Sequence, residues 1–485
     1  MTLHKLSAGS GYEYLTRQVA AMDSTEKGHV TLESYYSEKG ESPGVWVGSG
    51  MVGIDGLEAG NLVTTEQMRN LFGSGHHPLA DERLAALLMD ASDKQVNVVV
   101  RLGAPYRIFK NEGADFNIEV ARRVEALNVA AGRPSKADAG INVRAQVRSE
   151  LAREFFAREH GREPSSAREL ASAVARYSRP KRQAVAGFDL TFSPVKSVST
   201  LWAVAPPDVA AVVERAHQAA VQDALAFIER EVLFTREGLN GARQVETRGL
   251  VATAFTHRDS RAGDPDLHTH VAVANKVQTL DGKWLSIYGR ILYKAAVAAS
   301  ETYKTALELR LTEKLGVQFS ERPTAVQDKR PIREIVGIDA DLNSRWSSRR
   351  TDIEARRRVL VREFQGTHGR PPTPVEAIAL AQQANLETRQ KKHEPRSLAE
   401  QRSTWRAEAI DALGSEQAIG AMVRDALNPS PVEPERVSAA WVQTTAERVI
   451  GQVEAHRATW QVWHLRAEAQ RQIRGVAIPA DRVAD

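Results

Sequence analysis

Two apolar stretches that carry histidines constrain the fold of this chain most. Residues 250–257 and 268–277 each read as a β-strand, and a Gly-, Asp- and Pro-containing segment joins them. The second stretch begins with His268 and His270, which lie two positions apart and therefore point to one face of a strand. His257 ends the first stretch, so an antiparallel hairpin places it opposite one of them. The pattern predicts three imidazoles on one sheet face, a donor set that suits a metal ion. Three unrelated core or surface histidines are the alternative.

A further strand is predicted over residues 185–192. Its phenylalanine and leucine side chains alternate with Gly187, Asp189 and Thr191, so the two sets lie on opposite faces. A carboxylate on a central strand is costly to bury without a partner. If this strand lies beside the histidine strands, Asp189 can accept the second N–H of a metal-bound imidazole and fix its orientation. An exposed strand carboxylate is the alternative.

The composition excludes several kinds of site. The 485 residues include no cysteine, which rules out disulfides, thiolate metal sites and a cysteine nucleophile. No Gly-x-x-x-x-Gly-Lys-[Ser/Thr] sequence occurs, so we expect no P-loop ATP site. No apolar run approaches the roughly 18 residues of a membrane span, and the N-terminus lacks a signal-peptide pattern. We therefore expect a bacterial cytoplasmic protein whose metal ligands are His, Asp or Glu.

Other segments differ in character along the chain. A strand is expected over residues 96–102 and helices over about 207–232 and 295–315, whereas residues 345–485 are nearly all helix-forming apart from a proline-rich linker at 428–435. This pattern predicts three regions: a first domain over 1–325 with a helical basic insertion at about 105–182, a helical extension over 326–430, and a helical linker over 431–485.

Positive charge is concentrated in two of these segments. The whole chain carries only +4, but residues 141–182 hold ten basic and five acidic side chains, and residues 344–396 hold twelve and six. Such segments can neutralise phosphates, although a solvated helix of mixed charge gives the same counts. Both segments also contain Arg-Glu-Phe, then His-Gly-Arg and Pro, at 153–164 and 362–371. Two similar helix–turn–helix units are one interpretation, and similar caps on unrelated helices are the other.

Four of the nine tyrosines lie near the N-terminus: Tyr12, Tyr14, Tyr35 and Tyr36. A phenol has a pKa near 10, so it acts as a nucleophile only when a base or a cation promotes its ionisation. Phosphorus suits a phenolate, because the phenolate also leaves well enough to reverse the reaction. Tyrosines that only pack against neighbours are the ordinary alternative.

Several of these residues carry a family likeness. Phe188-Asp-Leu-Thr-Phe-Ser-Pro-Val-Lys-Ser-Val-Ser199 and His257…Asp264-Pro-Asp-Leu-His-Thr-His270 resemble the central motifs of MobF-class conjugative relaxases, which belong to the HUH endonucleases. Tyr-Tyr-Ser-Glu-Lys-Gly at 35–40 is similar to that family too, and the likeness spans about residues 1–320. It implies an α+β, HUH palm-like relaxase fold: a central antiparallel sheet with helices packed on one face, the histidines on the other, and a helical C-terminal extension.

The resemblance implies a metal-dependent DNA nicking-joining transesterase. His257, His268 and His270 would bind a divalent cation, for which Mg²⁺ and Mn²⁺ are expected and Zn²⁺ is a further candidate. Asp189 would orient one of these histidines.

An N-terminal tyrosine would attack the scissile phosphate of single-stranded origin-of-transfer DNA and form a 5′-phosphotyrosyl intermediate. We favour Tyr14 over Tyr12, and the pair Tyr35 and Tyr36 would serve the second transfer that ends conjugation.

The resemblance also implies partners. We expect origin DNA with a hairpin and an adjoining single strand, relaxosome accessory proteins, and a type IV secretion coupling protein, with no membrane insertion. The protein is expected to enter the recipient cell with the DNA. The 326–430 extension would contact DNA, and 431–485 would lead to a helicase domain beyond this chain. Candidate phosphate contacts are Lys181, Arg182, Lys196, Arg349 and Arg350. The rival functions are a rolling-circle replication initiator and a non-enzymatic DNA-binding regulator with a structural metal.

Overall fold

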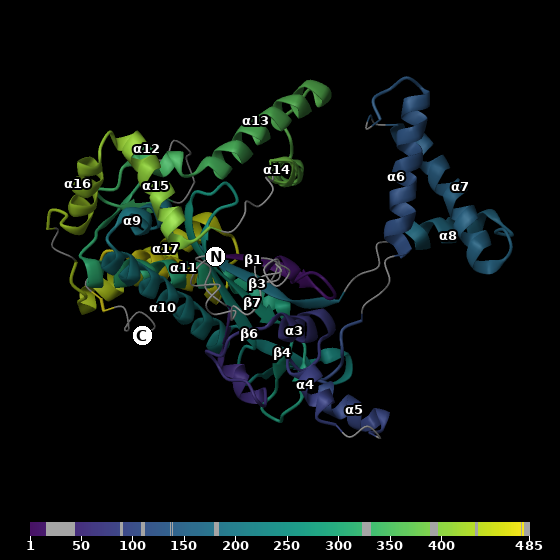
Figure 1. Ribbon diagram of the computed structural model, residues 1–485, viewed down its shortest axis with the longest axis horizontal. Coiled ribbons are helices and arrows are strands. Elements are labelled where there is room, and N and C mark those ends of the chain that lie inside the picture. The colour runs from purple at the N-terminus through teal and green to yellow at the C-terminus, as the bar shows by residue number, and fades with distance from the viewer. Residues whose placement is uncertain are drawn as a thin grey trace. The chain divides into compact units, whose positions relative to one another are not determined.

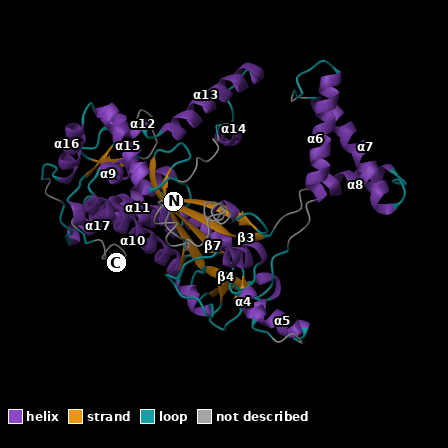
Figure 2. Ribbon diagram, viewed as in Figure 1, coloured by secondary structure: helices purple, strands orange, loops and turns teal. Residues whose placement is uncertain are grey.

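The computed structural model describes residues 1–15, 44–87, 91–107, 112–135, 137, 139–178, 184–322, 331–388, 396–431, 435–476 and 478–479. The chain divides into two compact units, drawn in Figures 1 and 2. Unit 1 comprises Met1–Leu6, Ser10–Pro105 and Ala186–Asp485, and unit 2 comprises Ser7–Gly9 and Tyr106–Val185. Within the described ranges, no helix combines the length and the hydropathy that crossing a membrane requires.

A five-stranded sheet in the order β1-β3-β7-β6-β2 forms the centre of the fold (Figure 2). The strands are β1 (Thr2–Ser7), β2 (Val45–Val47), β3 (Val185–Phe192), β6 (Ala252–Asp259) and β7 (Pro265–Ala274). The pairs β3–β7, β6–β7 and β2–β6 are antiparallel. The strands predicted around Asp189 and the histidines are confirmed, and so is the mixed α and β class with a central antiparallel sheet.

Three helices cover one face of this sheet: α9 (Lys196–Val204), α10 (Pro207–Glu231) and α11 (Gly289–Leu315). Phe192 of β3 packs against Tyr303 of α11 with ring centroids 5.2 Å apart. On β3, Phe192 alternates with Asp189, so the helix-covered face is the one opposite the carboxylate.

The other face is partly covered as well. The short helix α3 (Thr65–Met68) and the π-helix η2 (Arg69–Ser74) lie over the end that is distant from the histidines. Thr253 of β6 contacts Met68, and Gly187 of β3 lies against Phe72, where an added Cβ would be 3.0 Å from the ring. Helices therefore lie on both faces, and the histidine end of the second face remains for other groups.

The remaining elements of unit 1 are short helices, two-stranded ribbons and a helical C-terminal region. They are η1 (Ser49–Gly53), α4 (Ala80–Ala85), α5 (Asp93–Val100), β4 (Phe234–Glu237), η3 (Leu239–Gly241), β5 (Arg243–Glu246), β8 (Val277–Gln278), β9 (Trp284–Leu285), β10 (Phe319–Glu321), β11 (Arg333–Ile335), α12 (Ala340–Arg345), α13 (Ser348–His368), α14 (Pro374–Glu387), α15 (Leu398–Leu413), α16 (Glu416–Leu427), α17 (Ala439–His456) and α18 (Val462–Gln472). The predicted proline-rich linker lies between α16 and α17. The domain boundaries near 325 and 430 stay a prediction.

The strand predicted over 96–102 is wrong, because the chain forms helix α5 there. Ser92 and Gln95 form a capping box that starts the helix, and Val98 is 73% exposed. The valine run is therefore not buried in a sheet, and the cap outweighs the strand propensity of β-branched residues.

Unit 2 is a three-helix unit with its own core. It contains α6 (Glu112–Ala130), α7 (Gly140–His160) and α8 (Ala167–Ser178), and Phe116, Leu151 and Phe156 are among its buried side chains. Its helices lie in the segment expected at about 105–182 to be a helical basic insertion, and its assignment as an insertion stays a prediction.

Candidate active site

The two central strands bring the three histidines together. His257 of β6 pairs directly with His268 of β7, and His270 lies two residues further along the same face. Each pair of imidazole rings has its centroids 5.2 Å apart. One nitrogen from each ring lies within 4.8 Å of the others. The predicted convergence of the three imidazoles is present in the fold.

Hydrogen bonds orient two of these rings. His268 Nδ1 lies 2.7 Å from the carbonyl oxygen of Asp266, and His270 Nδ1 lies 2.9 Å from Asp189 Oδ2. Since both acceptors are oxygens without a proton, each Nδ1 carries the hydrogen and each Nε2 keeps its lone pair. Burial lowers the pKa of His268, which favours the neutral form that binds metal.

The donor set fits a divalent cation. The three residues supply nitrogen ligands from one sheet face, and a carboxylate supports one ligand from behind, as metal-bound histidines commonly require. Three protein ligands leave coordination positions for a substrate, which is typical of a catalytic rather than a closed structural site.

Asp189 links this cluster to Tyr14. The carboxylate is only 2% exposed, and it accepts a short hydrogen bond from the Tyr14 hydroxyl as well as the one from His270. The Tyr14 and His270 rings meet edge to face with centroids 6.1 Å apart. Burial, followed by the negative charge of Asp189, raises the pKa of Tyr14 far above its ordinary value of 10. The phenol is therefore held protonated beside a carboxylate that can accept its proton.

The other early tyrosines are placed differently. Tyr12 is 6% exposed and forms part of the core, and burial raises the pKa of its phenol. Tyr14 keeps 38% of its surface exposed next to the histidines. Tyr35 and Tyr36 lie outside the described residues.

Of the five candidate phosphate contacts, the structure describes Lys196, Arg349 and Arg350. Lys181 and Arg182 lie outside the described residues. The Lys196 ammonium is mostly buried and donates a hydrogen bond to the Pro265 carbonyl at 2.6 Å. It therefore contacts the start of β7 within the protein. Arg349 and Arg350 lie together at the start of α13, where Arg350 pairs with an acidic residue on the next turn of the helix.

The histidine strand has a polar support that sequence reasoning missed. His217 of α10 is fully buried, and its ring nitrogens lie 2.8 Å from Thr269 Oγ1 and 2.8 Å from the Tyr303 hydroxyl. Thr269 lies between His268 and His270 and points to the opposite face. The sequence feature that could have predicted this contact is the lone histidine on the apolar face of the predicted 207–232 helix.

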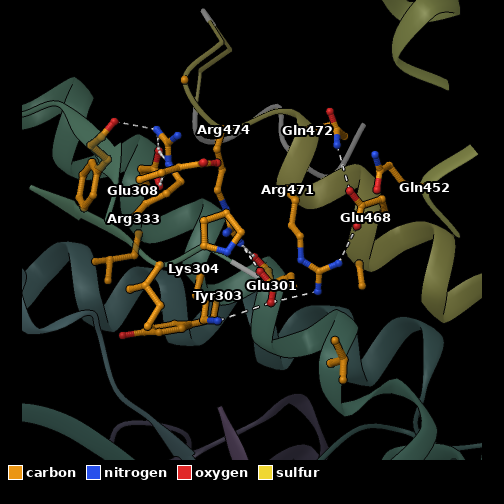
Figure 3. Close-up of a pocket in the computed structure, with 18 of the residues that line it drawn as sticks. Glu301, Tyr303, Lys304, Glu308, Arg333, Gln452, Glu468, Arg471, Gln472 and Arg474 are labelled. Carbon is orange, nitrogen blue, oxygen red and sulfur yellow. Dashed lines mark hydrogen bonds and ion pairs between the residues drawn. The ribbon is translucent and has the colours of Figure 1, made fainter. Parts of the chain in front are cut away.

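A charged cavity of about 1050 Å³ lies in unit 1, between α11, the β10–β11 ribbon and helices α17 and α18 (Figure 3). Figure 3 shows the Glu301 carboxylate between Arg471 and Arg474. Burial alone would raise the pKa of Glu301, but Arg474, Lys304 and Arg471 lower it to about 2. These ion pairs join α18 to α11, so the C-terminal helix is part of the packed structure of unit 1.

Comparisons with known proteins identify the family of this chain. A family profile described as TrwC relaxase matches residues 8–412. The chain belongs to the TrwC relaxase family. Membership in this family confirms the likeness to MobF-class conjugative relaxases.

Two relatives from Escherichia coli, one of them from strain K12, are each named multifunctional conjugation protein TraI. They are 34% identical over 187 residues and 32% identical over 182 residues. Each alignment covers 33% of this chain and 10% of the relative, so the chain spans about a tenth of their length.

Solved structures of the conjugative relaxase TrwC are also similar. One complex with oriT DNA has a TM-score of 0.49 at 20% identity, over 86% of this chain and 99% of that chain. A metal-bound complex with oriT DNA has a TM-score of 0.48 at 21% identity, over 84% and 97%.

Proposed function

We propose that this chain is the nicking and joining part of a conjugative relaxase, which cleaves single-stranded DNA at an origin of transfer. The observation that carries the proposal is the contact chain from the Tyr14 hydroxyl through Asp189 to His270 in the three-histidine cluster. Family membership supports the reaction class, and the geometry supports the assignment of residues.

In this proposal Tyr14 is the nucleophile and Asp189 is the base. The Tyr14 oxygen forms a bond to phosphorus while the bond between phosphorus and the 3′ oxygen breaks. The phenol proton passes to the Asp189 carboxylate, and the departing 3′ oxygen takes up a proton from solvent to become a free 3′-hydroxyl. The product is a 5′-phosphotyrosyl link, and the reverse sequence rejoins the strand. The high pKa of Tyr14 is the reason that a base is needed.

His257, His268 and His270 would hold the divalent cation. The chemistry that a cation supplies when bound there is Lewis-acid polarisation of a phosphoryl oxygen. Of the expected ions, Mn²⁺ and Zn²⁺ suit three imidazoles better than Mg²⁺, which prefers oxygen ligands and retains its water.

The wider biology is part of the same proposal. The DNA partner would be an origin hairpin with its adjoining single strand, and accessory proteins and a secretion coupling protein would join it. The protein would act in the bacterial cytoplasm and accompany the DNA to the recipient. Tyr35 and Tyr36 stay predicted for the second transfer.

The test is formation of a covalent protein–DNA adduct. Purified protein with Mn²⁺ is incubated with single-stranded oligonucleotides that tile the plasmid DNA around the gene, and denaturing gels report the adduct. Tyr14→Phe should form none, whereas the matched control Tyr12→Phe should form it, because Tyr12 packs in the core. Asp189→Asn should slow adduct formation by about 10²–10⁴-fold, the usual contribution of a general base.

The outcomes separate the rival functions. An adduct that persists in Tyr14→Phe overturns the assignment of the nucleophile. An adduct formed only with replication-origin oligonucleotides indicates a rolling-circle initiator. Tight DNA binding without any adduct indicates a regulator whose metal is structural.

A further inference from the structure

Helices α13 and α14 form an arm that is rooted beside the histidine cluster. The backbone N–H and hydroxyl of Ser348, the first residue of α13, both donate to Asp264 Oδ2, at 3.2 and 2.6 Å. Asp264 lies in the turn between β6 and β7, the two strands that carry the histidines. The chain that follows the arm returns to the same turn, where Trp405 Nε1 donates to the Gly263 carbonyl at 2.8 Å and Arg396 lies 3.6 Å from Asp259.

Most of the arm is exposed to solvent. Leu360 is the buried residue of α13 and Ala384 that of α14, and α13 extends away from the sheet in Figure 1. A helix of 21 residues is about 30 Å long, so the arm reaches well beyond the metal cluster. Two buried side chains give this helical hairpin little apolar core of its own, so polar contacts between α13 and α14 contribute to holding it together.

A polar lock at the tip holds the two helices together. Gly369 ends α13 in the left-handed conformation with φ 65°, and the Phe364 and His368 rings stack with centroids 4.0 Å apart. The Arg370 guanidinium lies 5.3 Å from the Phe364 ring and forms two bonds, of 2.8 and 2.9 Å, to the Glu376 carboxylate. Paired Arg–carboxylate bonds of this kind fix orientation as well as distance.

A similar lock occurs in unit 2, between α7 and α8, where the Phe–His pair meets edge to face instead of stacking. Gly161 has φ 66°, and the ring centroids of Phe156 and His160 are 4.2 Å apart. Arg162 lies 5.1 Å from the Phe156 ring and forms two bonds, of 3.0 and 2.7 Å, to Glu169. Both first helices have 21 residues. The sequence echo is therefore a repeated structural unit, in which Phe156, not Phe155, corresponds to Phe364.

The two copies differ in what covers them. In unit 2, helix α6 packs on α7 and α8, with Phe116 against Phe155 at 5.4 Å. In the arm, Glu363 precedes the stacked Phe364, as Phe155 precedes Phe156. A charged residue in place of Phe155 suits a surface that water or a charged partner covers.

The exposed surface of α13 is positively charged. The helix contains six arginines and three acidic residues. Arg350 and Arg356 are paired with Glu354 and Glu387. Arg357 and Arg362 are exposed and have no acidic partner within the described parts of the chain. An arginine without a carboxylate partner keeps its donors for a phosphate.

We propose that the α13–α14 arm is a DNA-backbone contact surface, and that Arg357 and Arg362 bind phosphates of the strand that leads to or from the cut phosphate. The inference rests on the proposed function, because the arm is rooted on the turn next to the histidines. The contacts at the tip hold α13 against α14 and so position the helix that carries these arginines before DNA binds, which reduces the entropy that binding costs.

The test measures DNA binding without any knowledge of the origin sequence. Fluorescence anisotropy follows binding of the full chain to an arbitrary single strand and an arbitrary duplex, each of about 30 nucleotides or base pairs, across a range of salt concentrations. R357A/R362A should weaken binding about tenfold at physiological salt. It should also reduce the slope of log K against log salt by about 1.4 for single strands or about 1.8 for duplex, which corresponds to two lost phosphate contacts. The form of DNA whose slope falls by its own expected amount is the one that the arm holds, and the form whose slope is unchanged is not held by the arm.

Two controls separate this effect from loss of net charge or of fold. R290A/R457A removes two exposed arginines outside the arm and should leave the slope unchanged. R357K/R362K keeps the charges and should retain the slope. The proposal is overturned if R357A/R362A binds like the unchanged protein, or if R290A/R457A loses as much. At saturating protein R357A/R362A should still form the covalent adduct, so a failure of nicking chemistry and a failure of the arm are distinguishable.

Discussion

Replacing the buried His217 with Gln should change how the stability of unit 1 depends on pH. The imidazole is fully buried between Thr269 and Tyr303. Burial, followed by the charge of a protonated His268, lowers the pKa of His217 from 6.5 to about 3. In the unfolded chain His217 therefore becomes protonated near pH 6.5, whereas in the folded chain it stays neutral down to about pH 3. The contribution of His217 to the free energy of unfolding is fully present above its unfolded-state pKa and is lost as the pH falls through this window.

The size of the effect follows from the two pKa values. Between pH 7 and pH 5, this one group should remove about 2 kcal/mol of the free energy of unfolding, because each pH unit below the unfolded pKa corresponds to about 1.4 kcal/mol. His217→Gln leaves one of the two hydroxyl partners unpaired, so it should be about 1–3 kcal/mol less stable at pH 7. It should then lose about 2 kcal/mol less than the unchanged protein on acidification.

Urea unfolding at pH 7, 6 and 5 measures both quantities, with tryptophan fluorescence as the signal. The difference between the two proteins cancels the contribution of the other histidines and of the carboxylates. If both proteins lose the same free energy between pH 7 and pH 5, the neutral buried state assigned to His217 is refuted.

Three further perturbations have definite expected outcomes. His268→Ala should abolish the rise in melting temperature that Mn²⁺ or Zn²⁺ gives the metal-stripped protein, since the cluster loses one of its three ligands; an unchanged rise places the ion elsewhere. Gly187→Ala should lower the melting temperature by several degrees, because its Cβ would lie 2.3 Å from the Val273 carbonyl oxygen, and a normal melt would show that β3 can shift. Glu301→Ala should lower the free energy of unfolding measured in urea by about 3–5 kcal/mol, because it leaves Arg474 without its carboxylate partner. A loss below about 1 kcal/mol would contradict the role of this ion pair in holding α18.

The sheet and its histidines were predictable because their signals are local. Alternation along β3 and β7 assigns each side chain to a face, and a short turn between β6 and β7 leaves little choice of partner. The positions of His257, His268 and Asp189 follow from those two rules.

Other features depend on contacts between segments that the sequence does not pair. Tyr12 and Tyr14 are nearly equivalent in sequence, and only the packing of the segment after β1 decides which one reaches Asp189. The strand prediction for the valines of α5 was wrong because the Ser92 cap, four residues before the first of them, outweighs their propensity. The support of β7 by His217 joins residues 52 positions apart, and no periodic pattern encodes that pairing.

The turn between β6 and β7 is shared by two parts of the molecule. Asp264 accepts hydrogen bonds from Ser348 at one end of the arm, and Gly263 accepts one from Trp405 after the other end, while the strands on either side carry the imidazoles. The turn therefore touches both the proposed cation site and the proposed DNA-binding arm. If a ligand bound at one of these sites changes the free energy of binding at the other, thermodynamics requires the reverse change to be equal. An ion at the histidines that strengthened DNA binding by the arm would itself be bound more tightly, by the same factor, while the DNA is bound.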